Sequence, residues 1–531
     1  MSLTFEEKIK LLTTGKNSRF ISKGLKGLEK ESLRITQSGS ISRLPHPSKW
    51  GSALTNPHIT TDYSEALPEF ITPPFENTDK TLDFLKDIHN FALSTIPQDE
   101  VLWNNSMPCQ INDDKDIPIA EYGKSNAGRM RHIYRLGLDY RYGRRMQAIA
   151  GIHFNYSLPE RFWEFEKELF PARENNSGNL RRNSTYLSMA RNYLRFGWLI
   201  LLLFGSSPAC CKSYLPQRSS RFKAIMENSL VAPYGTSLRM SDVGYKNKNQ
   251  SHLKINLNSL EQYIDALITA MKTPYPEYEA IGIYEENKQI QLSANLLQIE
   301  NEYYSSIRPK GTALEGQRPS VSLQKNGIDY IEMRGLDVNP FNAFGIDEDC
   351  MLFCEIFLIY CLLENSPPIS ETEHEVLEYN DLSVALRGRQ PNLALIKNTG
   401  ERKISIIDWS NYLLRKMIPI GEALDSSYQT KKYSQALQNQ MNLLKNPDLL
   451  PSARFHQLLV DSHQEYQDFN FDLANQHAEQ ISKDYLRLNK TSYFESVNSQ
   501  SQKKQSQLEA ESEYYDLDDY IKTYLSGETE K

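Results

Sequence analysis

The sequence predicts an α+β protein with a helical C-terminal part, and two observations support this fold class. Up to about residue 345 the 531-residue chain mixes alternating, strand-like patterns with helix-like ones, whereas almost every later segment is helix-like. No internal repeat of about 20–50 residues is present, which excludes solenoid and propeller architectures.

The elements of the first part follow from local patterns. The stretch GLEKESLRIT (27–36) is followed by the turn-forming residues QSGS, which predicts a strand that runs into a turn. Asn77 begins a helix whose apolar residues recur every third position until Pro97. The remaining elements expected here are strands over 146–157, 296–307 and 328–341, and a helix over 260–271 after a Ser259–Gln262 capping box.

Beyond Pro367 the chain predicts a series of amphipathic helices. They are expected around 403–417, 430–445, 452–487 and 505–525. The stretch NSQSQKKQSQ, which begins at Asn498, is low in complexity and is a candidate mobile segment.

Composition and charge narrow the possible function classes. Lys and Arg number 60 and Asp and Glu 67, so the net charge of −7 provides no basic field for a nucleic-acid binder. The longest apolar runs, 196–204 and 351–363, are shorter than the roughly 20 residues of a membrane helix. The six cysteines form no CxxC pair, and the N-terminus shows no signal-peptide pattern. We therefore expect a cytoplasmic protein without nucleic-acid or membrane partners.

Familiar nucleotide and hydrolase motifs are missing from the sequence. It contains no GxxxxGK[ST], GxGxxG, GxSxG or HExxH pattern. If the protein uses ATP, it must hold the phosphates in another way, and metal ions on carboxylates are the expected one.

Paired carboxylates provide candidate metal ligands. Glu29 and Glu31 are two residues apart in a strand, so both point to the same face, where two carboxylates repel each other unless a cation lies between them. Asp62 and Glu69 have opposite parity, so they can share a site only if the chain bends between them, for example near Pro68. In both cases the alternative is a set of solvated surface acids.

Two further strand-like stretches carry polar residues on one face. His153 and Asn155 share a face of GIHFNYS, which suits a ligand or substrate contact. Glu332 and Arg334 share a face of IDYIEMRGL and could be a metal ligand beside a phosphate-binding guanidinium. A packed histidine and a cross-strand ion pair are the corresponding structural alternatives.

Taken together, these segments resemble glutamate–cysteine ligase (γ-glutamylcysteine synthetase) of the proteobacterial type 1. The resemblance covers about residues 20–365, in the family's order, and becomes loose beyond them. The resembling stretches are KGLEKESLRI (26–35), GSALTNPHITTDYSEALPEFITP (51–73), SMPCQI (106–111), YGKSNAGRMRHIYRLGLDYRYG (122–143), MQAIAGIHFNYSLP (146–159), NYLRFGWLILLLFGSSPA (192–209), YGTSLRMSDVGY (234–245), LLQIENEYYSSIRPK (296–310) and YIEMRGLDVNPF (330–341).

The resemblance implies a glutamine-synthetase-like fold, in which a curled antiparallel sheet forms an active-site funnel surrounded by helices. It implies a catalytic body over residues 1–365 and a helical region over 366–531 that packs on the same body. A monomer is expected.

The resemblance also implies a reaction and its participants. ATP phosphorylates the γ-carboxylate of L-glutamate, and the L-cysteine amine displaces the phosphate to give γ-glutamylcysteine, the first step of glutathione biosynthesis. Two or more Mg²⁺ ions are the expected cofactors, with Mn²⁺ as a substitute, and glutathione is a possible feedback inhibitor. The alternatives are a ligase that joins glutamate to another amine and an inactive binding protein on this fold.

Residue roles are carried over by resemblance. Glu29, His153 and Glu332 resemble the ligands of one metal ion, and Glu31, Asp62 and Glu69 resemble those of a second. Arg239 and Asn155 are expected to bind glutamate, and Glu332 and Arg334 to act in catalysis. The expected phosphate-binding residues are Arg308, Lys310 and Arg334, and the expected cysteine pocket consists of Tyr63, Tyr134, Leu138, Ile149, Tyr245 and Tyr304. Tyr63 stands where the family commonly has Phe, so it adds a hydroxyl to that pocket.

Overall fold

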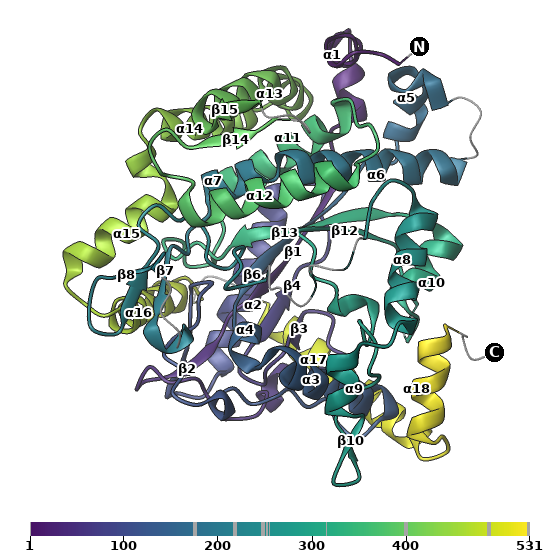
Figure 1. Cartoon of the computed structure of the whole chain (residues 1–531), viewed down its shortest axis with the longest axis vertical. Coiled ribbons are helices and arrows are strands. Elements are labelled where there is room, and N and C mark those ends of the chain that lie inside the picture. The colour runs from purple at the N-terminus through teal and green to yellow at the C-terminus, as the bar shows by residue number, and fades with distance from the viewer. Residues whose placement is uncertain are drawn as a thin grey trace.

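The computed structural model describes residues 2–173, 178–215, 220–245, 250, 253, 255–314, 316–397, 402–485 and 490–527. Its centre is a six-stranded antiparallel sheet with the order β12-β13-β6-β1-β4-β3 (Figure 1). The strands of this sheet are β1 (Leu25–Glu31), β3 (Ile59–Thr61), β4 (Pro68–Ile71), β6 (Gly151–Ser157), β12 (Ile307–Lys310) and β13 (Tyr330–Asp337).

Shorter strands form small separate sheets. They are β2 (Arg34–Thr36) with β5 (Glu100–Leu102), β7 (Ala209–Cys211) with β8 (Lys223–Ala224) and β9 (Ser229–Val231), β10 (Tyr284–Glu285) with β11 (Lys288–Gln289), and β14 (Ala394–Ile396) with β15 (Lys403–Ser405). The helices are α1 (Phe5–Thr13), α2 (Thr78–Thr95), α3 (Asn126–Tyr142), α4 (Arg144–Gln147), α5 (Phe162–Leu169), α6 (Gly178–Phe196), α7 (Trp198–Phe204), α8 (Leu260–Lys272), α9 (Pro276–Ile281), α10 (Pro319–Asn326), α11 (Glu348–Leu363), α12 (Glu371–Arg387), α13 (Ile406–Tyr428), α14 (Lys432–Lys445), α15 (Pro451–Ser462), α16 (Tyr466–Tyr485), α17 (Thr491–Ser512) and α18 (Leu517–Ser526).

The two faces of the central sheet differ in character because side chains alternate along each strand. On β1, Lys26 forms a buried ion pair with Glu355 of α11, and Lys30 lies against His89 of α2. Leu28, on the same face, is fully buried. This face therefore packs on helices, which leaves Glu29 and Glu31 on the other face.

Helix α11 forms the centre of the helical layer. Every residue from Cys350 to Leu363 is buried, as expected for a helix that is apolar on all sides. It packs against α6, α13 and α14, which lie in the upper half of Figure 1. Among the described residues, no helix is long and apolar enough to cross a membrane. The mixture of an antiparallel sheet with helices confirms the predicted α+β class.

Three of the predicted strands differ from the structure. The strand expected over 27–36 is split between β1 and β2, which belong to different sheets. The one expected over 146–157 begins only at Gly151, because α4 precedes it. Most of 296–307 is no strand: it includes a short 3₁₀ turn at Glu300–Glu302, where Glu300 binds Arg318 and Glu302 binds Arg141.

The C-terminal helices also correct two expectations. The segment expected as one helix over 452–487 is divided between α15 and α16 at His463, which has a left-handed backbone with φ 54°; residues 486–489 lie outside the described residues. The stretch beginning at Asn498 is part of α17, where Asn498 and Ser501 are buried. Their side chains hydrogen-bond to Asn56 and Ser52. A boundary near residue 365 stays a prediction.

Candidate active site

The face of the sheet opposite the packed one gathers acidic and histidine side chains from neighbouring strands. Glu29 of β1 pairs with His153 of β6, and Glu31 pairs with Glu69 of β4. Ligand atoms of Glu29, Glu69 and His153 lie within 4.8 Å of one another. The spacing of two between Glu29 and Glu31 therefore places both on the site face, as the sequence predicted.

His153 lies at the centre of this cluster. Its Nδ1 is 3.0 Å from Glu29 Oε2 and 3.5 Å from Glu332 Oε1, and its Nε2 is 3.6 Å from Glu31 Oε1. Asn155 donates from Nδ2 to Glu29 Oε1 at 2.9 Å. The structure thus brings together the ligands expected on β1, β6 and β13.

Asp62 reaches the cluster because the chain reverses between β3 and β4. Thr61 pairs with Pro68 at the end of this hairpin, and the Asp62 amide donates to Leu67 O at 3.0 Å. Pro68 is the first residue of β4, a position where proline is tolerated. The bend between Asp62 and Glu69 that their opposite parity requires is therefore present.

Two carboxylates of the cluster, Glu31 and Glu69, lack enough compensating positive charge. Burial and the nearby Asp62 raise the pKa of Glu31 to about 8. Burial and the neighbouring Glu29 raise the pKa of Glu69 well above its ordinary value. Carboxylates in such a setting ionise when a cation binds among them.

The donor atoms fit a hard divalent cation. Glu332 is 1% exposed, and its Oε2 has no hydrogen-bond partner among the described residues. Carboxylate oxygens with one imidazole suit Mg²⁺ or Mn²⁺. The residues present therefore fit the expected metal ions, although the contacts of His153 and Glu69 join the two expected ligand sets into one continuous cluster.

Basic side chains line the β12–β13 side of the cluster. Arg334 Nη1 donates to Glu332 Oε1 at 3.0 Å, and Lys310 Nζ is 3.5 Å from Glu332 Oε2. Although burial alone would raise it, these cations hold the pKa of Glu332 well below its usual range. Arg308 pairs with Glu332 across β12 and β13 and donates to Tyr303 O at 2.6 Å.

Arg239 lies over the first residue of β6. A Cβ atom on Gly151 would be 2.0 Å from Arg239 Nη2 and 2.4 Å from its Cζ, so the guanidinium occupies the space above this glycine. Arg239 Nη2 donates to Arg334 O at 2.8 Å, and its Nη1 is 4.0 Å from Asp337 Oδ1. Its Nε has no hydrogen-bond partner among the described residues.

Aromatic residues expected in the cysteine pocket lie beside Arg239. The Tyr245 ring stacks on Tyr304 with centroids 5.3 Å apart, and the Arg239 guanidinium lies 5.0 Å from the Tyr245 ring. The Tyr245 hydroxyl donates to Ile149 O at 3.1 Å. Tyr63 is 1% exposed, and its hydroxyl has no hydrogen-bond partner in the described structure.

The other two pocket residues come from α3. Leu138 is buried, whereas Tyr134 is half-buried and packs both on the main core and on a smaller apolar cluster that includes Ile521 of α18. Burial and the nearby Glu302 raise the pKa of Tyr134 well above its ordinary value, so it stays a neutral phenol.

Sequence reasoning missed Asp337 and Gly151. Asp337 accepts hydrogen bonds from Ser206 N at 3.0 Å, Ser207 Oγ at 2.7 Å and Ser237 Oγ at 2.8 Å. Simple alternation from Glu332 would place Asp337 on the packed face, but the register shifts between Met333 and Leu336 and pairs Asp337 with Gly151. A single sequence does not reveal such a register shift, so the position of Asp337 could not be predicted.

Comparison with known proteins identifies the family. The model of the family described as glutamate-cysteine ligase matches residues 9–384. The chain belongs to the glutamate–cysteine ligase family. A relative named glutamate–cysteine ligase from Alcanivorax borkumensis is 44% identical over 459 residues, which cover 85% of this chain and 86% of that protein. One of the same name from Pseudomonas putida is 40% identical over 99% of both chains.

A solved structure extends the similarity to the fold. The crystal structure of glutamate–cysteine ligase from Francisella tularensis in complex with AMP matches with a TM-score of 0.89 and 33% identity, over 95% of this chain and 97% of that one. Because the match spans nearly the whole chain, it confirms the glutamine-synthetase-like α+β fold expected from the sequence.

Proposed function

We propose that this glutamate–cysteine ligase family enzyme joins the γ-carboxylate of L-glutamate to the amine of L-cysteine at the expense of ATP, the first step of glutathione biosynthesis. The observation that carries the proposal is the carboxylate–histidine cluster on the sheet face, with Arg334 and Lys310 directly beside it. Such a set suits phosphoryl transfer to an acid, which needs cations around the transferred phosphate.

Arg239 and Asn155 are the proposed glutamate-binding residues. A guanidinium binds a carboxylate through two parallel hydrogen bonds, and the Nε of Arg239 is without a protein partner among the described residues. The Asn155 Oδ1 atom is likewise a buried acceptor without a donor, which the glutamate ammonium would supply. The two residues would hold the α-carboxylate and the α-amine and so direct the γ-carboxylate to the cluster.

Glu29, Glu31, Asp62, Glu69, His153 and Glu332 are the residues that would hold the metal ions. Mg²⁺ held there would neutralise the negative charge of the ATP phosphates during transfer. Glu332 has a second role, because it orients Arg334 and Lys310, the cations that would contact the transferred phosphoryl group. Arg308 lies directly opposite Glu332 on β12 and completes the basic side.

Two steps account for the ligation. A γ-carboxylate oxygen of glutamate attacks the γ-phosphorus of ATP, the bond to the β–γ bridging oxygen breaks, and ADP leaves. The cysteine amine then attacks the carbonyl carbon of the γ-glutamyl phosphate, loses a proton, and expels phosphate. The half-buried, stacked rings of Tyr245 and Tyr304 would help to keep water from hydrolysing that intermediate.

The test is phosphate release from Mg-ATP with glutamate, measured with and without cysteine. We expect release to require glutamate and metal ion and to rise with cysteine, with one γ-glutamylcysteine formed per phosphate. Phosphate release that is indifferent to cysteine would contradict the proposal. Substitution of other small amines for cysteine decides between this enzyme and a related glutamate–amine ligase.

Glutathione inhibition is part of the same proposal. Glutathione contains the γ-glutamylcysteine unit of the product, so it would occupy the glutamate and cysteine subsites together. Inhibition competitive with glutamate is the expected pattern.

A further inference from the structure

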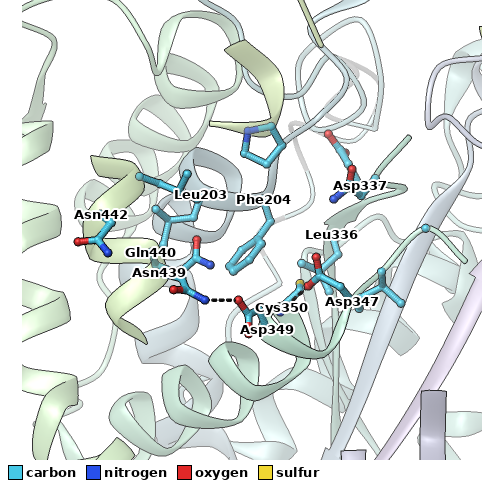
Figure 2. Close-up of a pocket in the computed structure, with 15 residues that line it drawn as sticks. Leu203, Phe204, Leu336, Asp337, Asp347, Asp349, Cys350, Asn439, Gln440 and Asn442 are labelled. Carbon is cyan, nitrogen blue, oxygen red and sulfur yellow. Dashed lines mark hydrogen bonds between the residues drawn. The ribbon is translucent and has the colours of Figure 1, made fainter. Parts of the chain in front are cut away.

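A second cavity lies on the packed side of the sheet. Its volume is about 380 Å³, and it lies between α7, the end of β13, the start of α11 and α14 (Figure 2). Leu336 of its wall pairs with Ile152, whose side chain points away from His153 because side chains alternate along β6. The cavity is therefore separate from the carboxylate cluster, and the reaction proposed above does not use it.

The walls of the cavity are apolar on one side and acidic on the other. Leu203, Phe204 and Leu336 provide the apolar part. Asp347 and Asp349 lie at the start of α11, where Asp347 accepts from Cys350 N at 2.9 Å and Asp349 accepts from Asn439 Nδ2 at 2.5 Å. Figure 2 shows this last bond as a dashed line between two residues of the cavity wall.

The charge of the cavity favours a cation. Asp337 also lines it, but its charge faces Arg239, so Asp347 and Asp349 are the carboxylates to be balanced. None of the described lining residues is Lys, Arg or His. The N-terminus of α11 contributes about half a positive charge, which offsets only part of two carboxylates. A ligand with positive charge would balance the remainder.

Gln440 gives independent support for a hydrogen-bonding ligand. Its side chain lines the cavity from α14 and is 4% exposed, and its Oε1 atom has no hydrogen-bond partner among the described residues. A buried acceptor without a donor costs about 1–3 kcal/mol. The missing partner is an N–H or O–H donor inside the cavity.

We propose that this cavity binds a small organic cation that carries a primary ammonium group on an alkyl chain. The ammonium would donate to Gln440 Oε1 and to the Asp347 and Asp349 carboxylates, and the alkyl chain would lie against Leu203 and Phe204. A bare metal ion does not fit as well, because the volume of about 380 Å³ is many times that of one ion and half of the wall is apolar.

The test is calorimetric titration of the full chain with 1,4-diaminobutane. We expect one molecule to bind per chain, and Asp349→Asn and Gln440→Met each to weaken binding by about tenfold or more, as loss of one charged or buried hydrogen bond predicts. Asp83→Asn is the matched control, because Asp83 is an exposed carboxylate paired with Lys86 outside the cavity. Ligase activity without diamine should be unchanged in all three variants.

Three outcomes would overturn the proposal. They are no binding to the wild-type chain, binding that is equally strong in Asp349→Asn and Gln440→Met, and binding of MgCl₂ alone with the same dependence on Asp349. The two variants change different helices, so a folding defect in one leaves the other as a test.

Discussion

The Gly151→Ala substitution should displace the Arg239 guanidinium without unfolding the sheet. The new Cβ would lie 2.0 Å from Arg239 Nη2, 2.4 Å from Cζ and 2.5 Å from Nε, so the whole guanidinium must move. The atoms in conflict are the far end of a flexible side chain and not backbone, which predicts that the fold survives. The predicted loss is therefore in glutamate binding.

The size of the effect follows from the hydrogen bonds that Arg239 would make to the glutamate α-carboxylate. A hydrogen bond to a charged group contributes about 1.5–3 kcal/mol, and about 1.4 kcal/mol corresponds to a tenfold change. We expect KM for glutamate to rise about 10- to 100-fold in Gly151→Ala. KM for ATP should change little.

Gly27→Ala is the matched control on the adjacent strand. A Cβ at Gly27 would meet its nearest atoms at 3.7 Å, which is ordinary contact. Steady-state kinetics with each substrate varied in turn, together with melting curves, measures both variants. An unchanged glutamate KM in a folded Gly151→Ala protein would contradict a role of Arg239 in glutamate binding, as would equal losses for glutamate and ATP.

Three more predictions concern single residues around the site. Tyr63→Phe removes a buried hydroxyl without a partner in the described structure, so denaturant unfolding should show a gain of about 1 kcal/mol. KM for cysteine should rise about 3- to 10-fold through loss of the hydrogen bond from that hydroxyl to the substrate, and an unchanged KM would show that the hydroxyl does not contact cysteine. Burial lowers the pKa of Lys30 to about 7, so between pH 7 and 10 Lys30 is neutral when folded and takes up a proton on unfolding. The stability advantage of Lys30→Met over wild type should therefore grow by about 1.4 kcal/mol per unit as pH falls from 10 to 7. A constant difference would contradict a neutral, buried Lys30 beside His89. Ile521→Ala leaves a cavity next to α3 and should lower the free energy of unfolding by about 2–3 kcal/mol. Because Tyr134 packs on the same apolar cluster, KM for cysteine should rise while KM for ATP stays constant. Equal changes in both KM values would indicate a general loss of structure.

Most of the site could be predicted from the sequence because side chains alternate regularly between the two faces of a strand. Glu29 with Glu31, and His153 with Asn155, lie on one face as their spacing of two requires. The opposite parity of Asp62 and Glu69 correctly required a bend, which the β3–β4 hairpin provides. Each segment contains residue types that suit a metal ion. Whether these residues meet at one site depends on the order of the strands in the sheet, which only the family resemblance implied.

The rest depended on interactions between segments far apart in the sequence. The register shift in β13 turns Asp337 toward Arg239, and no local pattern indicates it. The polar stretch of α17 is ordered because Asn498 and Ser501 bond to the loop around Asn56, although its composition is typical of a mobile tail. Likewise, charge pairing of Glu300 and Glu302 with distant arginines replaces the strand expected there.

The proposed ligation depends on metal ions held by the carboxylate–histidine cluster. Titration of Mn²⁺ by electron paramagnetic resonance, with ATP present, compares the wild-type chain with Glu29→Gln, and γ-glutamylcysteine formation is measured on the same samples. We predict that Glu29→Gln, while still folded, binds fewer ions than wild type and loses turnover by about 1000-fold, as the loss of several kcal/mol of charge stabilisation requires. A folded Glu29→Gln protein with the full complement of Mn²⁺ and near-wild-type turnover at saturating Mg²⁺ would contradict the account.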